Sequence, residues 1–273
     1  MSSPATQTTS ATPSPAHGVG FWEGQGKAAS VDWCEPNYEW SYWVAEFWNV
    51  LSSAPMVVIG LLALWRLHRS SQRPEPRFIL CFLGLTVVGA GSMAFHASLL
   101  QVAQALDELP MVYCSLVMTY CVVARSKDTI KDAPLLFRWQ LGFTLYAVAF
   151  TAAYFMSEDY FSLFIASFAA VVTYLVIQGW RVVYRLSPSR TNKRLYGVAA
   201  TAFVSGVTLF WLPERNLGCE HPLQAVHLHA WWHLLAMVGT YVGFLLVVFD
   251  RLTTLEQAPK LETGAVPWVA AGR

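Results

Sequence analysis

Three histidines stand within seven residues near the end of the chain, in the segment HLHAWWH at 227–233. His229 and His233 are four residues apart, so a helix would place both rings on one face, about one turn apart. This spacing suits a metal ion bound by two imidazoles, but it also suits two ordinary histidines on a helix surface. The choice depends on the surroundings, because ionisable groups inside a membrane helix are costly and usually functional.

The composition indicates a membrane protein. Of the 273 residues, 55% are hydrophobic and only 13% are charged, against about 25% charged in a typical soluble domain. Twelve tryptophans and eleven tyrosines are typical of a chain with membrane interfaces. The net charge of +1 argues against electrostatic binding of nucleic acid. We therefore expect an all-α, multi-pass integral membrane protein in contact with membrane lipids and without a nucleic-acid partner.

Seven stretches are long and apolar enough for membrane helices, with six or eight spans as the alternatives. They are 43–65, 78–100, 103–124, 135–156, 160–182, 195–213 and 226–249. The second and third are so close in sequence that we expect a tight antiparallel hairpin.

The two ends of the chain are expected to lie outside the helix bundle. Residues 1–20 are rich in Ser, Thr and Pro and predict a disordered tail. They lack the basic start and apolar centre of a signal peptide. Residues 251–273 are polar and predict a loose cytosolic tail. The domain between them, 21–250, would hold all seven transmembrane helices.

The basic residues orient this predicted bundle. Sixteen of the eighteen Lys and Arg fall on one side, whereas only Lys27 and Arg215 fall on the other. Lysine and arginine collect on the cytosolic side of membrane proteins. The N-terminus should therefore be luminal or extracellular, and the C-terminus cytosolic.

With this orientation, five polar residues from three spans share one depth near the non-cytosolic side. They are Ser92, His96, Asp107, His229 and His233. Singly, the serine could bond its own helix backbone and the aspartate could cap a helix. Together they favour one shared polar site.

The residue types of this site predict metal-dependent hydrolysis. Three neutral imidazoles with an open fourth position are the ligand set of a hydrolytic zinc centre, in which zinc lowers the pKa of a bound water to about 7. Asp107 could then act as a base, and Ser92 could hydrogen-bond the water or the developing oxyanion. Inside a bilayer, the substrate of such a hydrolase should be a lipid.

Five motifs resemble those of the alkaline ceramidases, in the same order and at similar spacing. They are DWCEPNY (32–38), AEFWN (45–49), GSMAFH (91–96), LDELPMVY (106–113) and HAWWH (229–233). The resemblance covers about residues 20–250. It implies a seven-helix enzyme that hydrolyses the amide of ceramide to a sphingoid base and a fatty acid. It also implies His96, His229 and His233 as zinc ligands, with Ser92 and Asp107 assisting catalysis.

The resemblance further implies a calcium site near the N-terminus. Its ligands would be Asp32, Glu35, Asn37, Glu46 and the backbone carbonyl of Trp33. Hard oxygen donors of this kind are what calcium requires. The alternative is an acidic cap around the first helix. A carboxylate at Glu46, without a Lys or Arg nearby in sequence, favours calcium.

The remaining histidines and cysteines have simpler predicted roles. His227 should face away from the metal, and His221 should lie in a loop. Cys81, Cys114 and Cys121 fall in spans and predict buried apolar side chains. Cys34 and Cys219 both fall on the non-cytosolic side, where disulfides form. We expect them to pair, with two free thiols as the alternative.

The leading hypothesis is a zinc-dependent amidase of ceramides in the membrane of the endoplasmic reticulum or Golgi. One alternative is a lipid-sensing receptor of the related progestin/adipoQ type, which is expected to have the opposite orientation. Another is a related hydrolase of phospholipids or GPI lipids. An obligate protein partner and the preferred acyl chain are not indicated.

Overall fold

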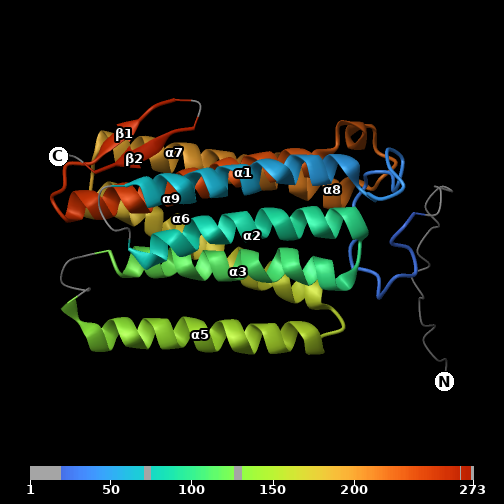
Figure 1. Cartoon of the computed structure of the whole chain (residues 1–273), viewed down its shortest axis with the longest axis horizontal. Coiled ribbons are helices and arrows are strands. Elements are labelled where there is room, and N and C mark those ends of the chain that lie inside the picture. The colour runs from blue at the N-terminus through green and yellow to red at the C-terminus, as the bar shows by residue number, and fades with distance from the viewer. Residues whose placement is uncertain (1–19, 71–74, 126–130, 265, 272–273) are drawn as a thin grey trace, which may run out of the picture.

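A computed structural model describes residues 20–70, 75–125, 131–264 and 266–271 and is mostly helical (Figure 1). The long helices are α1 (Phe47–Arg69), α2 (Pro76–Ser98), α3 (Gln101–Val123), α5 (Ala133–Met156), α6 (Tyr160–Arg181), α7 (Arg190–Ser205) and α9 (Leu228–Thr254). The shorter elements are η1 (Val182–Leu186), η2 (Gly206–Trp211), α8 (Leu212–Leu217) and η3 (Pro222–Val226). Most of the predicted N-terminal tail, residues 1–19, lies outside the described residues.

Each of the seven predicted spans corresponds to a helix within a few residues. Among the described residues, six helices are long and apolar enough to cross a membrane. They begin at Phe47, Pro76, Gln101, Tyr160, Arg190 and Leu228. The seventh, α5, has 24 residues, but Arg138 and Gln140 near its start lower its hydropathy. The prediction of an all-α membrane bundle is confirmed, whereas the count of seven spans stays a prediction.

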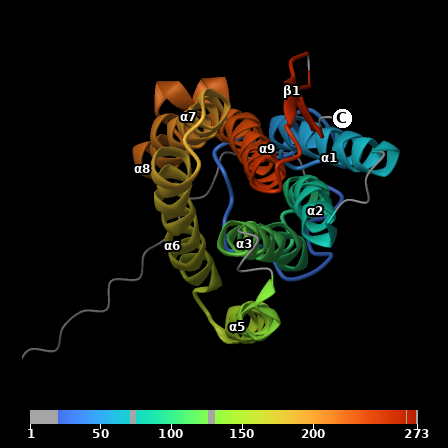
Figure 2. The same cartoon turned by 90° about the vertical axis from the view of Figure 1, so that its left-hand side faces the viewer.

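The centre of the bundle is α9, which lies against α1, α2 and α7 (Figure 2). Its first turns and its last turns both contribute buried residues, from Leu228 to Arg251. In contrast, α5 lies at the edge and buries Phe150 and Tyr154. It therefore contributes few buried residues to the packing of the bundle.

The turn between α2 and α3 is as tight as predicted. Leu99 takes a left-handed backbone conformation (φ 51°), and its N–H donates to the Phe95 carbonyl at 2.7 Å. The N-terminal segment 20–46 covers this turn: the Ala29 N–H donates to Leu99 O and the Gln101 N–H donates to Lys27 O, both at 2.9 Å. The segment that carries the acidic motif is therefore fixed to the end of the bundle where α2 meets α3.

The prediction of a loose tail after residue 250 is wrong for the residues that the structure describes. Strands β1 (Lys260–Glu262) and β2 (Trp268–Ala270) form an antiparallel hairpin. Trp268 and Val269 are buried, and the Trp268 ring lies 5.8 Å from that of Phe82 in α2. The segment docks because two apolar side chains in an otherwise polar tail can be removed from water.

We expect Trp268→Ala to lower the stability of the purified protein. Truncating a buried tryptophan costs about 3 kcal/mol or more, and roughly 1 kcal/mol shifts the unfolding midpoint of a domain of this size by about 2–4 °C. The midpoint in detergent should therefore fall by roughly 6 °C or more. Trp40→Ala is the matched control, because Trp40 is 59% exposed. Equal midpoints for the two variants would show that the hairpin does not stabilise the bundle.

Candidate active site

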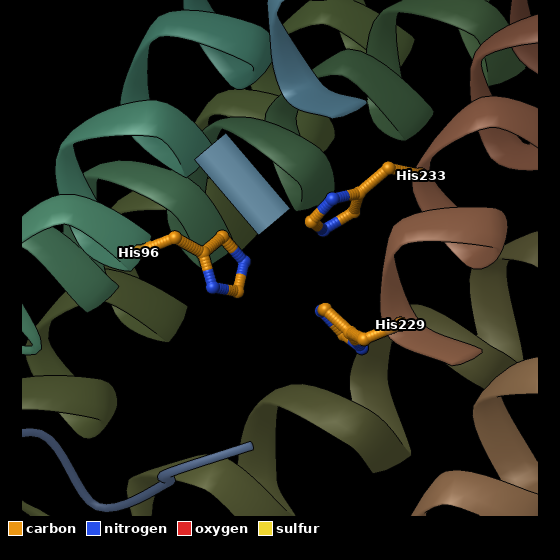
Figure 3. A group of neighbouring side chains, drawn as sticks. All are labelled: His96, His229 and His233. Carbon is orange, nitrogen blue, oxygen red and sulfur yellow. The ribbon is translucent and has the colours of Figure 1, made fainter. Parts of the chain in front are cut away.

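Three histidines converge inside one end of the bundle (Figure 3). His96 comes from the last turns of α2, whereas His229 and His233 come from the first turns of α9. One nitrogen from each ring lies within 4.8 Å of the others, and all three residues are at least 96% buried. Among the described residues, this is the group of His, Cys, Asp and Glu side chains that could hold a metal ion.

Glu46 orients the first of these rings. One carboxylate oxygen, Glu46 Oε2, contacts His96 Nδ1 and accepts from Asn49 Nδ2 at 3.1 Å. The His96 Nδ1–H therefore donates to the carboxylate, which leaves the lone pair on Nε2. His96 Nε2 is buried and has no hydrogen-bond partner in the described part of the chain. A carboxylate behind a ligating histidine is the usual support of a metal site.

Two serines of α1 orient the second ring. His233 Nδ1 lies 2.9 Å from Ser52 Oγ and 3.1 Å from Ser53 Oγ. Both hydroxyls donate their own proton to the Asn49 carbonyl, at 3.1 and 2.8 Å, so each can only accept from the imidazole. His233 therefore carries its proton on Nδ1 and directs the Nε2 lone pair elsewhere.

The third ring, His229, is held by stacking. Its ring lies 3.6 Å from that of Trp33, with 24° between the planes, and its Nδ1 is buried without a hydrogen-bond partner among the described residues. Buried polar atoms normally have partners, so unpartnered nitrogens on His96 and His229 call for an explanation. The donor set and these nitrogens both fit a zinc ion, which binds neutral imidazoles.

Ser92 and Asp107 lie beside the histidines. Ser92 is buried and its Oγ lies 2.9 Å from Ser53 Oγ. The neighbouring Gly91 allows α3 to approach, since a Cβ at this position would lie 2.0 Å from the Leu106 carbonyl oxygen and 3.0 Å from the Asp107 nitrogen. This close approach brings the start of α3, with Asp107, against the Ser92 turn of α2.

The site opens into one apolar cavity of about 530 Å³. Ser92, Asp107, His229 and His233 line it, together with Trp33. The rest of its wall is mainly apolar and comes from α3, α6, α7 and α9. A mostly apolar cavity with a few convergent polar groups is the usual form of a small-molecule site.

The predicted calcium ligands are only partly brought together. Asn37 Nδ2 donates to both Asp32 oxygens, at 3.1 and 3.0 Å, and the Asp32 carboxyl lies within hydrogen-bonding reach of Glu46. Asn37 Oδ1 is buried without a partner among the described residues. These three side chains share one location.

Of the other two predicted ligands, Glu35 has different contacts, whereas Trp33 contacts Glu46. Glu35 caps α1, where its oxygens accept from the Trp48 and Asn49 N–H groups at 2.6 and 3.0 Å. Burial raises the pKa of Glu35 to about 7, although these two bonds oppose the shift. Trp33 donates its N–H to Glu46 Oε1 at 2.9 Å. The acidic segment therefore both caps α1 and supports the histidine cluster through Glu46.

The remaining predicted residues lie outside the cluster. The Sγ atoms of Cys34 and Cys219 are 2.15 Å apart, which is a disulfide, while Cys81, Cys114 and Cys121 are free and buried. His227 sits before α9 with its ring 5.7 Å from that of Trp48. His221 accepts from the Leu223 N–H at 3.2 Å and caps the start of η3.

Sequence reasoning missed a buried hydrogen-bond network around the start of α3. Glu108 accepts from Gln104 Nε2 and from Tyr154 of α5, both at 2.7 Å. Gln104 Oε1 in turn accepts from Tyr160 and from the Ser30 N–H, at 3.1 and 2.8 Å. The signal was available, because Gln104 and Glu108 are four apart in an apolar span. The network fixes α3 against α5, α6 and the N-terminal segment, next to Asp107.

Comparisons with known proteins found one family model and several curated relatives that match most of the chain. The family model described as Ceramidase matches residues 25–270. Alkaline ceramidase 3 of Mus musculus is 31% identical over 259 residues, covering 89% of this chain and 91% of the relative. Putative alkaline ceramidase dcd3A of Dictyostelium discoideum is 31% identical, covering 81% and 88%. Alkaline ceramidase YPC1 of Saccharomyces cerevisiae is 27% identical, covering 83% and 78%.

Proposed function

This chain belongs to the ceramidase family, and we propose that it hydrolyses the amide bond of ceramides to a sphingoid base and a free fatty acid. His96, His229 and His233 would hold the zinc ion for this reaction. The observation that carries the proposal is the cluster of three oriented imidazoles that opens into an apolar cavity beside Ser92 and Asp107. When bound, zinc would act as a Lewis acid and make water acidic enough to attack at neutral pH.

The chain's own residues supply the proton transfers and the orientation. Asp107 accepts a proton from the attacking water as the new C–O bond forms, and passes it to the amide nitrogen as the C–N bond breaks. Ser92 turns its hydroxyl away from Ser53 Oγ and donates a hydrogen bond to the oxygen that becomes negative in the tetrahedral intermediate. Glu46, Ser52 and Ser53 hold two imidazole rings in the tautomer that directs Nε2 inward.

The proposed substrate fits the shape and polarity of the cavity. Its polar end carries His229, His233, Ser92 and Asp107, and its apolar wall suits a hydrocarbon chain. The cavity lies among helices apolar enough to cross a membrane, so a lipid can enter from the bilayer without crossing water.

We further propose seven spans with the N-terminus on the luminal or extracellular side, in the endoplasmic reticulum or Golgi membrane. The distribution of Lys and Arg supports this orientation. It places the histidine cluster near the luminal leaflet, together with Cys34 and Cys219, in a compartment that permits their disulfide.

Calcium binding at the acidic segment is also proposed, with Asp32, Glu35, Asn37, Glu46 and the Trp33 carbonyl as ligands. The contacts of Asp32 with Asn37 and Glu46 support it. We expect calcium to increase the free energy of unfolding of chelator-treated protein by RT ln(1 + [Ca²⁺]/Kd), about 2.7 kcal/mol at one hundred times the Kd. The unfolding midpoint should rise accordingly. Differential scanning fluorimetry with increasing calcium measures this shift.

Two variants make the calcium experiment specific. Asp32→Asn should lose the calcium-induced shift, since it removes a charge that the ion needs. Glu39→Gln should keep it, because Glu39 is an exposed acid of the same segment outside the ligand set. A shift that persists in Asp32→Asn and disappears in Glu39→Gln would place the ion elsewhere.

The test of the main proposal is turnover by purified protein in detergent, with metal content measured on the same sample. Release of fatty acid from ceramide, with about one zinc per chain, is the expected result. Phosphatidylcholine and a GPI lipid, tested in parallel, address the related hydrolases. Zinc without hydrolysis of any of these lipids would instead favour a receptor of the progestin/adipoQ type.

A further inference from the structure

The cavity that begins at the histidines ends at an ion pair. Arg125, after α3, and Asp250, near the end of α9, both line it. The Arg125 guanidinium donates twice to the Asp250 carboxylate, from Nε at 2.8 Å and from a terminal nitrogen at 2.9 Å. The side chains are 17% and 4% exposed, so the pair closes the end of the cavity that is opposite to the metal-binding histidines.

The length of the cavity can be estimated along α9. His233 and Asp250 are seventeen residues apart on this helix, which corresponds to roughly 25 Å at 1.5 Å per residue. One acyl layer of a bilayer spans about 15 Å, half of the hydrocarbon core. A chain that enters past the histidines therefore has roughly 25 Å of cavity, more than the depth of one acyl layer, before its end meets Arg125 and Asp250.

Neighbouring contacts keep this ion pair in place. Arg77 donates to the Ala124 carbonyl at 2.7 Å, and Arg251 donates to the Arg125 carbonyl at 3.2 Å. Glu75 joins the two arginines, since it accepts from Arg77 at 2.6 Å and from Arg251 at 2.7 Å. The backbone at Ala124 and Arg125 is thus tied to the start of α2 and the end of α9.

A hydrocarbon chain cannot easily displace the Arg125–Asp250 pair. To pass it, a methyl end would have to separate the two charges and leave the Asp250 carboxylate buried without a partner, which is strongly unfavourable. A chain that stops short of the pair leaves it intact. The two side chains therefore fill the end of the cavity and impose an upper limit on chain length, and their ion pair keeps them in place.

We propose that the Arg125–Asp250 pair is the floor of the substrate cavity and sets the longest hydrocarbon chain that the enzyme accepts. The inference rests on the proposed ceramide hydrolysis. It assigns chain-length specificity to an ion pair that is about 25 Å from the reacting groups, as measured along α9 from His233 to Asp250. The chain concerned is either the acyl chain or the sphingoid base, which share the same chemistry, and the experiment separates them.

The decisive comparison uses two double variants. Arg125→Ala/Asp250→Ala removes both charges and opens space, whereas Arg125→Met/Asp250→Leu removes both charges but fills the space. The kcat/KM is measured for a series of ceramides whose acyl chain runs from well shorter to well longer than roughly 25 Å when extended, the distance from His233 to Asp250 along α9. A second series varies the sphingoid base at fixed acyl length.

We expect the alanine double variant to move the length limit upward in one of the two series. Just beyond the wild-type limit, its kcat/KM relative to a short-chain ceramide should rise roughly tenfold, the gain expected from about two more buried methylene groups. The Met/Leu double variant should keep the wild-type limit. An unchanged limit in the alanine variant, or the same shift in both doubles, would overturn the proposal.

Two further variants guard against a loss of folding and against indirect effects. Val247→Phe adds bulk one turn before Asp250 on the cavity wall and should move the limit to shorter chains. Glu75→Gln alters the surrounding ion pairs without lining the cavity and should leave the limit in place. A limit unmoved by Val247→Phe would contradict the proposed path of the chain.

A binding measurement separates this inference from the proposed function. Saturated free fatty acids of the same lengths are titrated into detergent-purified protein, and the unfolding midpoint is recorded. If no ceramide is hydrolysed, the proposed function fails, but the floor is still tested by this series. A longer maximum length in the alanine double variant supports the floor. Identical profiles for wild type and this variant refute it.

Discussion

His233→Ala is expected to remove the bound metal and, with it, ceramide hydrolysis. Substitution of a residue that only supports a metal ligand typically costs 10–100-fold in affinity or activity, so loss of a ligand itself should exceed about a hundredfold. The measurement is fatty-acid release from ceramide, with zinc determined by mass spectrometry on the same protein. Wild type should hold about one zinc per chain, and the variant close to none.

Two comparisons make this result specific to the site. His227→Ala removes a histidine six residues earlier on the chain, whose ring packs near Trp48 and outside the cluster, so metal and activity should remain. Ser52→Ala/Ser53→Ala removes both hydroxyls that accept from His233 Nδ1, and should weaken zinc binding by about 10–100-fold without abolishing it. Full activity in His233→Ala would refute the proposed metal site.

The helices and the meeting of the histidines could be predicted from local patterns. The apolar runs are about as long as a bilayer is thick, so their existence needed no tertiary information. The Lys and Arg distribution then placed the end of α2 and the starts of α3 and α9 at one depth. The structure brings Ser92, His96 and the two α9 histidines together, as a shared depth predicts.

The partners of those residues could not be assigned, because they depend on side-chain directions between distant segments. Glu46 has an adequate sequence interpretation as a calcium ligand, yet it also contacts His96, fifty positions away. Ser52 and Ser53 resemble ordinary helix serines, and their role follows only from the rotation of α1 toward His233. Polar residues at a spacing of three or four in an apolar span were the available signal.

The C-terminal hairpin and the Arg125–Asp250 pair could not be predicted from the sequence for a different reason. A prediction based on average polarity treats residues 251–273 as a loose tail, whereas docking depends on the single buried ring of Trp268 and its neighbour Val269. Likewise, Arg125 was counted as a cytosolic charge, and its pairing with Asp250 follows only when α3 and α9 end side by side. One or two residues decide such contacts, so composition does not reveal them.

Asp107→Asn is expected to abolish most of the hydrolysis while leaving the metal in place. The amide keeps the size of the side chain but cannot accept a proton from the attacking water, and general-base catalysis contributes about 10²–10⁴-fold. Asp107 is not a member of the three-histidine cluster, so zinc should stay near one per chain. The measurement pairs kcat with metal content, as for His233→Ala, and the two variants should differ only in the metal.

Ser92→Ala completes the argument, because the serine and the aspartate have different proposed roles. Loss of one oxyanion donor costs about 10²–10³-fold in kcat, and zinc content should again be unchanged. A structural metal site in a receptor would need neither residue, so unchanged lipid binding without any turnover in wild type and both variants would favour that alternative. If zinc is lost in parallel with activity in Asp107→Asn, the carboxylate supports the metal site, and the base that activates water must be sought elsewhere in the cavity.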